Sequence, residues 1–375
     1  MVELGTLIHQ AKIVRCGEGD YPVLSMTMHD GLVFQNDKFN KTIASKDRSD
    51  YKVVNRNQLV ISFPIDEGVL AAQRIVDAGI VSPAYGIWDI NQEMILPEFL
   101  EYALRCDRAL SYYKAKLRGS TARRRSLPTP TLLAYTVPLP DISEQEHILN
   151  VVHKTQKVIS GRTEEISLLD NLIKARFVEM FGDYLKDDRR PLSEVAIITG
   201  GLTKNSNRNT FETKMPYLRV ANVFYNRLDL REILEIGVKE EEIEKTLLQA
   251  GDLLFVEGNG SIEQIGRVAI WDGSIDPILH QNHLIKARFN NEIIAPEYAL
   301  FYFMLQDGRQ QIISKSVSTS GLNTLSVNKV SSLLLPIPPI ALQKQFAEFI
   351  NQTDKSKVVV QKALDEAQTL FDSLM

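Results

Sequence analysis

Apolar positions follow a long helical pattern in two places along the chain. Residues 143–182 and 341–375 carry apolar side chains at alternating steps of three and four, starting near Ile148 and Phe346. This heptad spacing is typical of helices that pack along one seam. At about 1.5 Å per residue, each helix would be about 50–60 Å long. Because helices of this length are rarely stable alone, we expect the two to pack antiparallel against each other.

Shorter patterns precede each long helix and predict mixed α and β structure. Leu59-Val60-Ile61 and Leu253-Leu254-Phe255-Val256 are apolar runs bounded by turn residues, as in strands. Pro97 and Pro296 each stand where a new apolar helical pattern begins, which favours the first helical position. The fold class predicted from these patterns is α/β (mixed α+β).

The two halves of the sequence repeat each other. Val137-Pro138-Leu139-Pro140 with Gln145 recurs as Leu335-Pro336-Ile337-Pro338 with Gln343, at a constant separation of 198 residues. The separation is 199 residues at Pro97 and Pro296, and 194 residues further upstream. Such self-similarity indicates two copies of one domain. The predicted organisation is a domain at 1–142, a helix at 143–182, a domain at 183–340 and a helix at 341–375.

The copies match well at their ends and poorly in their middles. Residues 26–50 and 220–244 hardly agree, whereas the flanking segments agree in type and spacing. One scaffold with two different variable surfaces suits a protein that reads two different half-sites. The alternative is a duplicated enzyme in which one copy has decayed.

Composition places the chain among ordinary globular proteins. It has 375 residues, 44% hydrophobic content and a formal net charge of −4. No apolar stretch approaches the ~20 residues of a membrane span, and the N-terminus shows no signal-peptide pattern. Cys16 and Cys106 lie far apart and form no ligand motif, which fits a reduced compartment. We therefore expect a cytoplasmic protein with no membrane segment.

Charge is segregated along the chain. Residues 105–125 hold eight basic residues and one acid, whereas residues 229–245 hold six glutamates. A protein of negative net charge can therefore still present one basic face to phosphates. We interpret the acidic stretch as a solvated face.

Catalytic and metal motifs are missing from the sequence. Residues 255–260 only superficially resemble a glycine-rich S-adenosylmethionine turn, and no Asn/Asp-Pro-Pro-aromatic tetrad or Gly-x-x-x-x-Gly-Lys-Ser/Thr loop occurs. Gly258 and Gly260 are interpreted as turn glycines. His280 and His283 have no suitably spaced third ligand. We predict no catalytic residue, no cofactor and no metal.

With these motifs missing, the remaining candidate chemistry is binding. Sequence-specific contact with DNA would need hydrogen-bond donors and acceptors on loops that reach base edges, together with basic groups that contact phosphates. In the first copy the candidates lie in one basic loop: Lys116, Arg118, Ser120, Thr121, Arg123, Arg124 and Arg125. In the second copy they lie in the equivalent loop and near the start of the domain: Lys315, Ser318, Thr319, Asn323, Lys204, Asn205, Arg208, Arg219 and Asn222. Each loop could instead be a surface turn, and Arg219 and Asn222 could equally buttress a turn inside the domain.

Several segments together resemble a known family. They are Leu192-Ser193-Glu194-Val195, Pro216-Tyr217-Leu218-Arg219-Val220-Ala221-Asn222-Val223, Gly251-Asp252-Leu253-Leu254, Gly266-Arg267-Val268-Ala269 and Leu333-Leu334-Leu335-Pro336-Ile337-Pro338-Pro339 with Gln343. In order and duplication the chain resembles the specificity (S) subunit of Type I restriction–modification systems over essentially its whole length. The first copy departs from the pattern, with Tyr21–Met26 and no Arg-x-x-Asn, so its readout should use a different surface.

The resemblance implies a function. Each target-recognition domain would read one half of a bipartite, asymmetric site in double-stranded DNA. The paired helices, with the domains as a pseudo-twofold repeat, would act as spacer and as docking platform for two methyltransferase (M) subunits. A full complex would add motor–nuclease (R) subunits. The chain itself would be a non-catalytic specificity subunit, and the alternative is a coiled-coil scaffold that does not bind DNA.

Overall fold

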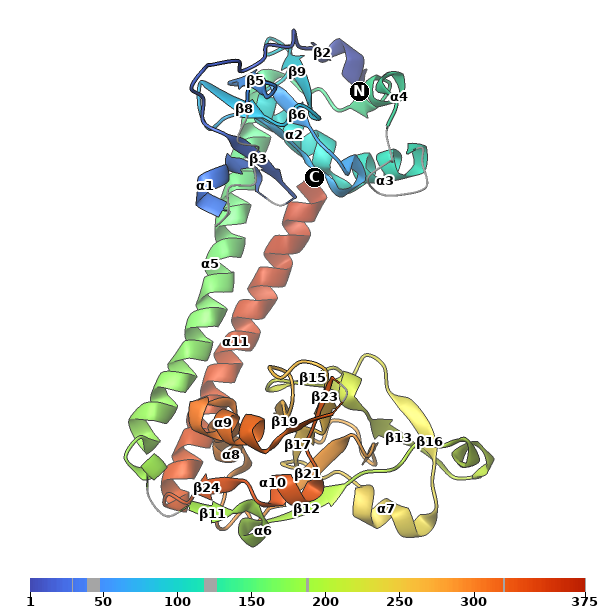
Figure 1. Ribbon diagram of the computed structural model, residues 1–375, viewed down its shortest axis with the longest axis vertical. Coiled ribbons are helices and arrows are strands. Elements are labelled where there is room, and N and C mark those ends of the chain that lie inside the picture. Colours follow the sequence, from blue (N-terminus) through green and yellow to red (C-terminus); the bar gives the residue numbers. More distant parts are fainter. Residues whose placement is uncertain (29, 39–47, 118–126, 187–188, 320, 375) are drawn as a thin grey trace. The chain divides into compact units, whose positions relative to one another are not determined.

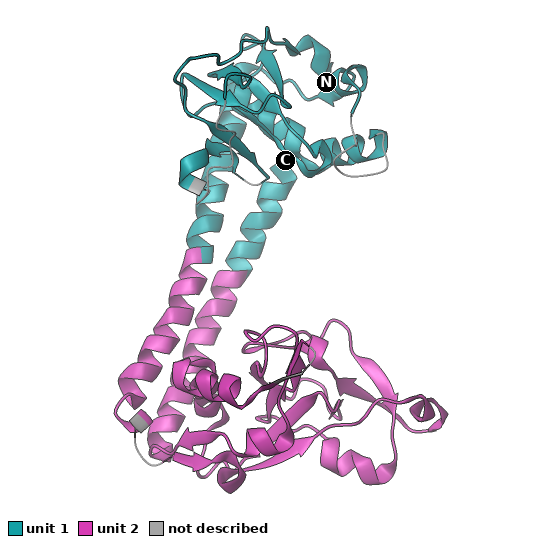
Figure 2. Cartoon of the chain, viewed as in Figure 1, with its two compact units in different colours: residues 1–163, 362–375 teal, residues 164–361 magenta. Residues whose placement is uncertain are grey.

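The computed structural model describes residues 1–28, 30–38, 48–117, 127–186, 189–319 and 321–374. Contacts divide the chain into two compact units, coloured separately in Figure 2. Unit 1 contains residues 1–163 and 362–375, and unit 2 contains residues 164–361. Both long helices, α5 (Ile142–Phe181) and α11 (Ile340–Leu374), contribute residues to both units.

Unit 1 is built around a four-stranded antiparallel sheet in the order β2-β9-β6-β7. Three two-stranded sheets accompany it, β1 with β10, β3 with β4, and β5 with β8. Its strands are β1 (Val2–Glu3), β2 (Ile8–Gln10), β3 (Leu24–Thr27), β4 (Gly31–Phe34), β5 (Lys52–Asn55), β6 (Leu59–Ile61), β7 (Leu70–Ala72), β8 (Ala78–Val81), β9 (Gly86–Ile90) and β10 (Thr136–Val137). Its shorter helices are α1 (Gln35–Lys38), α2 (Pro97–Arg105), α3 (Asp107–Lys116) and α4 (Thr129–Leu133).

Unit 2 repeats this plan with a larger middle. Its four-stranded antiparallel sheet has the order β12-β21-β17-β19, and a second sheet has the order β16-β13-β20. The strands are β11 (Arg189–Pro191), β12 (Ala196–Gly200), β13 (Lys214–Leu218), β14 (Val223–Phe224), β15 (Arg227–Leu228), β16 (Leu234–Gly237), β17 (Leu253–Val256), β18 (Gly258–Asn259), β19 (Val268–Ile270), β20 (Leu279–His280), β21 (Leu284–Phe289), β22 (Val317–Thr319), β23 (Leu322–Thr324) and β24 (Leu334–Pro336). The shorter helices are α6 (Leu192–Val195), α7 (Glu240–Thr246), α8 (Pro296–Met304), α9 (Gln306–Lys315) and α10 (Val327–Ser331).

The element order confirms the mixed α/β fold and its internal repeat (Figure 1). The pair β1–β10 corresponds to β11–β24, and helices α2, α3 and α4 correspond to α8, α9 and α10. Pro97 and Pro296 both stand at the first position of their helices, as predicted. The sheet β16-β13-β20 and the helix α7 belong to the poorly matching middle of the second copy.

In each unit a buried glutamine near the start of the long helix hydrogen-bonds to backbone groups of two other segments. Gln145 accepts a hydrogen bond from the backbone of Leu96 and donates to the carbonyls of Met94 and Pro140, at 2.8–3.0 Å. Gln343 makes the corresponding three bonds to Ala295, Ile293 and Pro338, at 2.8–3.0 Å. Both glutamines have 0% relative exposure, so their amides satisfy backbone groups that water does not reach. The repeated Pro-x-Pro and glutamine spacing therefore corresponds to a hydrogen-bonded connection between the long helix and its domain, which we call the glutamine joint.

The long helices pack antiparallel within each unit. In unit 2 the ring of Phe346 lies 5.4 Å from that of Phe177, and Lys357 reaches Asp170 at 2.7 Å. As residue numbers rise along α11, the partners on α5 fall. In unit 1, Val152 and Leu374 line the same small cavity, which gives the same antiparallel order. The helix α5 ends at Phe181, and the next residue, Gly182, donates its N–H to the carbonyl of Val178 at 2.8 Å.

Two further findings bear on the composition argument. Cys16 and Cys106 are buried free thiols. Within the described part of the chain, no helix combines the length and the apolar character needed to cross a membrane.

Candidate nucleic-acid interface

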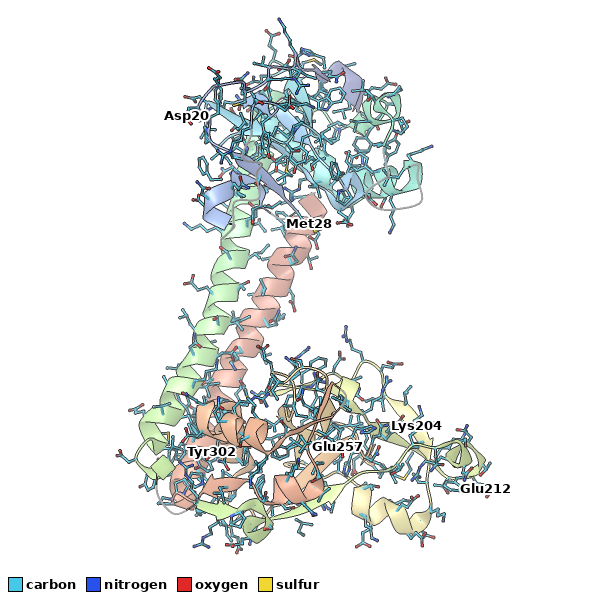
Figure 3. The ribbon with its side chains drawn as sticks, in the orientation of Figure 1. Asp20, Met28, Lys204, Glu212, Glu257 and Tyr302 are labelled. Atoms are coloured by element: carbon cyan, nitrogen blue, oxygen red, sulfur yellow. The ribbon has the colours of Figure 1, made fainter. Side chains whose placement is uncertain are left out.

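One end of the unit 2 sheet gathers segments that are far apart in the sequence. Glu257, just after β17, donates its N–H to the carbonyl of His283 at 2.9 Å and accepts from the N–H of Leu325 at 2.7 Å. Asn282 donates to the carbonyl of Leu202 at 2.9 Å. These backbone bonds bring together residues 202–205, 257–260, 281–283, 317–319 and 321–325, which we call the loop end of unit 2. Figure 3 labels Glu257 and Lys204 in this unit.

The polar segment predicted as a loop in unit 2 is a β-hairpin. Strands β22 and β23 pair antiparallel, with Ser318 opposite Asn323, and β18 pairs with β23 on the other side. The Asn323 side chain is 8% exposed and donates to the carbonyls of Asn259 and Gly260 at 3.3 Å. β-Branched Val and Thr at the hairpin ends favour strand over loop. The hairpin is thus attached to the sheet, and Gly258 lies in a strand where a turn was expected.

Six of the predicted contact residues lie at or beside this loop end. Lys204 and Asn205 have exposed side chains. Ser318 and Thr319 lie in β22, and Lys315 ends the helix that precedes this strand. Asn323 lies there too, but its amide is used to hold the hairpin. The structure therefore brings together two segments that lie more than one hundred residues apart in the sequence, and both carry predicted contact residues.

Arg208 lies elsewhere and is engaged inside the domain. Its side chain is 8% exposed and pairs with both carboxylate oxygens of Glu242, at 2.8 and 3.1 Å. It also donates to the carbonyl of Gly237 at 2.9 Å. The hydrogen bond from Arg208 lowers the pKa of Glu242 below its usual value. A bidentate pair of this kind fastens the segment before β13 to α7.

Arg219 and Asn222 buttress a turn, which is one of the two roles left open by the sequence. Asn222 is 3% exposed and accepts from the N–H of Arg219 at 2.9 Å. Its side-chain amide donates to the carbonyls of Asp229 and Glu232, at 2.8 and 3.0 Å. The Arg219 guanidinium forms an ion pair with Glu232. All the donor and acceptor groups of the Asn222 amide are therefore used internally.

In unit 1 only part of the predicted basic loop is described. Lys116 is the last residue of α3 and is exposed. Arg118, Ser120, Thr121, Arg123, Arg124 and Arg125 lie outside the described residues. Their predicted contacts with DNA therefore rest on the sequence.

A basic and aromatic hairpin near the loop end was missed by the sequence reasoning. On the β14–β15 turn, Arg227 and Arg267 lie over the ring of Phe224, at 4.6 and 5.0 Å from its centroid. Arg309 lies 5.5 Å from the centroid of Tyr225, and burial lowers the pKa of both Arg267 and Arg309. The adjacent Phe-Tyr-Asn-Arg run was the available signal, because aromatic and basic residues often alternate on nucleic-acid surfaces.

The two histidines do not form a metal site together. His280 has 0% exposure and its Nδ1 lies 2.8 Å from the carbonyl of Thr246. Burial lowers the pKa of His280 to about 4. His283 instead pairs with Glu257 at 2.9 Å. Among the described residues no three His, Cys, Asp or Glu side chains gather as a metal would require.

Comparisons with known proteins agree with this architecture. Residues 188–367 match the family described as Type I restriction modification DNA specificity domain. The putative type I restriction enzyme MjaX specificity subunit of Methanocaldococcus jannaschii is 29% identical over 199 residues, which cover 52% of this chain and 45% of that protein. The Type I restriction enzyme EcoKI specificity subunit of Escherichia coli is 27% identical over 164 residues, which cover 42% of this chain and 34% of that protein.

The matched segments span less than half the length of either relative. The fold is similar over the whole chain to one in a solved structure on complex assembly and conformational transition of the type I R-M system. That match has a TM-score of 0.61 and 16% identity, and covers 100% of this chain and 95% of the other. Residues 188–367 thus match a Type I restriction modification DNA specificity domain, and the chain is similar to the specificity subunits of Type I restriction enzymes.

Proposed function

We propose that this chain is the sequence-specific DNA-recognition subunit of a Type I restriction–modification enzyme, and that each unit reads one half of a bipartite, asymmetric site. One observation carries the proposal: the same sheet and helix order occurs twice, with different side chains at the same end. A repeated scaffold with unlike surfaces suits two unlike half-sites. The chain supplies recognition without catalysis, and cytoplasmic partner subunits supply the chemistry.

The contacts that we propose follow from residue type and, for Lys204, Asn205 and Lys116, also from exposure. Lysines such as Lys204, Lys315 and Lys116 are suited to phosphates, whereas Asn205, Ser318 and Thr319 are residue types that hydrogen-bond to base edges. The arginines of the unit 1 loop, with Ser120 and Thr121, are retained as proposed contacts. Arg208 and Asn222 are not retained, because their polar groups are used inside unit 2. Asn323 is assigned the role of holding the hairpin.

Exposed apolar side chains on the long helices support a docking surface for M subunits. Within unit 2, Leu168 and Leu172 on α5 are 60% and 50% exposed, and Val358 and Val359 on α11 are 69% and 70% exposed. The Asp170–Lys357 pair places these four residues on neighbouring stretches of the two helices. Single exposed apolar residues are common, but a group on adjacent helices is typical of a protein contact. We propose that M subunits dock on the helices, and that R subunits join in the full complex.

The test uses the full chain together with its cognate methyltransferase subunit. A library of random DNA duplexes should yield one bipartite motif in binding, and adenine methylation should occur at the same motif. Inserting four residues after Gly161 and four after Val359 adds about one turn to each helix, or about 5.4 Å. Both half-sites should stay the same while the gap between them grows by one or two base pairs, at about 3.4 Å per base pair.

Two results would contradict the proposal. Absence of sequence enrichment at both low and high salt would favour a scaffold that does not bind DNA. Altered bases with an unchanged gap would show that the helices do not set the spacing.

A further inference from the structure

The repeat allows the loop end of unit 2 to be compared, residue by residue, with the corresponding part of unit 1. In unit 1, β6 pairs with β9, and in unit 2, β17 pairs with β21, in corresponding registers. The corresponding pairs are Leu59 with Trp88 and Leu253 with Ala287, then Ile61 with Gly86 and Phe255 with Ile285. Two residues beyond Ile61 and Phe255 stand Phe63 and Glu257. These two residues therefore occupy the same position on the two scaffolds.

In unit 2 this position carries a hydrogen-bonding pair. Glu257 and Nδ1 of His283 are 2.9 Å apart, with side chains 30% and 56% exposed. A carboxylate can only accept, so Nδ1 carries a proton. When the imidazole ring is neutral, the outer nitrogen, Nε2, is a hydrogen-bond acceptor. An acceptor held in a fixed direction is suited to the amino group of adenine or cytosine in the major groove.

In unit 1 the same position carries an aromatic pair. Phe63 is 49% exposed, and its ring meets that of Tyr85 edge-on, with centroids 6.2 Å apart and planes at 78°. The carbonyl of Tyr85 accepts a hydrogen bond from Nζ of Lys52 at 2.7 Å. This bond holds the backbone of Tyr85, whose ring contacts Phe63. A phenylalanine ring offers neither donor nor acceptor. The ring can therefore contact only an apolar group on a base edge. In the major groove, the methyl group of thymine is that apolar group.

We propose that Phe63 in unit 1 and His283 in unit 2, oriented by Glu257, determine specificity at one base pair each. Phe63 contacts a thymine methyl in the half-site of unit 1. His283 accepts a hydrogen bond from an adenine or cytosine amino group in the half-site of unit 2. This assignment rests on the proposed function and adds to it the chemistry read by each unit. Backbone hydrogen bonds join Asn282 to Leu202, near Lys204 and Asn205, and Glu257 to Leu325, next to the hairpin. DNA bound by these segments would therefore lie near His283.

The experiment repeats the library selection with the complex of full chain and methyltransferase subunit. His283→Ala should reduce the preference at one position of one half-site by about tenfold or more. Phe63→Ala should do the same in the other half-site only. Glu257→Gln keeps an acceptor for Nδ1 and should retain the preference, whereas Glu257→Ala should weaken it.

Matched controls exist in the chain. His9 is 76% exposed and lies 3.4 Å from Asp89, so His9→Ala removes a similar pair at another place. Ile13 is 53% exposed, so Ile13→Ala removes a similar exposed apolar side chain. Both variants should keep the full motif. Thermal unfolding of each variant checks that it is folded.

A chemical substitution sharpens the unit 1 assignment. Replacing thymine by uracil at the position affected by Phe63→Ala deletes only the methyl group. Binding by the unaltered chain should weaken, and binding by Phe63→Ala should not change. If His283→Ala and Phe63→Ala both keep full discrimination while the unaltered chain selects a bipartite motif, this assignment is wrong and the proposed function stands. If the unaltered chain selects no motif, the proposed function itself fails.

Discussion

Units 1 and 2 share a scaffold and differ in what the scaffold carries. The sheet order and the glutamine joint are the same in both. Unit 1 carries Phe63, in ring contact with Tyr85, at the position where unit 2 carries Glu257, paired with His283. Backbone pairing and core packing constrain the shared parts, whereas exposed side chains at strand ends are under no such constraint. The comparison therefore separates what the fold needs from what recognition is free to change.

The two units also hold the long helices differently. In unit 2, Phe346 is fully buried and its ring lies 5.4–5.5 Å from those of Phe177, Phe181 and Phe301. In unit 1 the repeat places the smaller Ile148 at this position, half-buried beside a cavity of about 50 Å³. Aromatic packing contributes more buried area than an isoleucine at the edge of a cavity. At this position, therefore, more side-chain area is buried against the helix pair in unit 2 than in unit 1.

The largest expected effect tests this difference in packing. Phe346→Ala should lower the free energy of unfolding of unit 2 by about 3–5 kcal/mol, and Ile148→Ala should lower that of unit 1 by about 1–2 kcal/mol. The chain has two tryptophans, Trp88 in unit 1 and Trp271 in unit 2, both buried. Urea unfolding followed by fluorescence in Trp88→Phe and Trp271→Phe backgrounds reports each unit separately. Val358→Ala, at a 69% exposed position, is the control, and equal losses in both units would refute the difference.

A second prediction concerns mild acid, where the units should respond in opposite directions. Burial lowers the pKa of His280 to about 4 from 6.5, so the unfolded chain takes up a proton at higher pH than the folded chain. Unit 2 should therefore lose stability as pH falls from about 6.5 to about 4, by roughly 3 kcal/mol at most. In unit 1 burial raises the pKa of Glu101, so protonation there favours the folded state.

The scaffold provides the control for this prediction. The repeat places Val81, also buried, where unit 2 has His280. His280→Val should remove most of the acid sensitivity of unit 2 between pH 6.5 and 4, measured by Trp271 fluorescence during unfolding. A variant that keeps the full pH dependence would show that other groups cause it.

The smallest expected effect concerns the basic loop, which has no arginine counterpart in the unit 2 hairpin. Arg123→Ala with Arg124→Ala should weaken binding to all sequences and reduce the salt slope of the affinity by about one per lost phosphate contact. Titrations of the complex at several salt concentrations measure this slope. Arg15→Ala with Arg56→Ala is the matched control, because both arginines are partly exposed and paired with aspartates. An unaltered slope in the loop variant would place the loop away from DNA.

Much of the fold could be predicted because its signals are local or periodic. The heptads of α5 and α11, the prolines that open α2 and α8, and the repeated Pro-x-Pro with glutamine each depend on residues close in sequence. The polar segment around Asn323 was expected to be a loop, because its donors and small residues resemble turn chemistry. Its pairing with β18 depends on residues some 60 positions earlier and could not be inferred locally.

The sequence alone determined the duplication, the long helices and the segments that carry polar side chains, because these follow from residue type and spacing. Only the tertiary structure decided which of those side chains remain available. Arg208 and Asn222 are residue types that contact DNA, but their polar groups are already hydrogen-bonded. Arg208 pairs with Glu242, and the Asn222 amide donates to two backbone carbonyls. Likewise, Glu257 and His283 became a candidate pair only when β17 and β21 were paired. Whether a polar group finds a hydrogen-bond partner depends on the residues that the order of strands in the sheet brings next to it. Local sequence patterns do not predict that strand order.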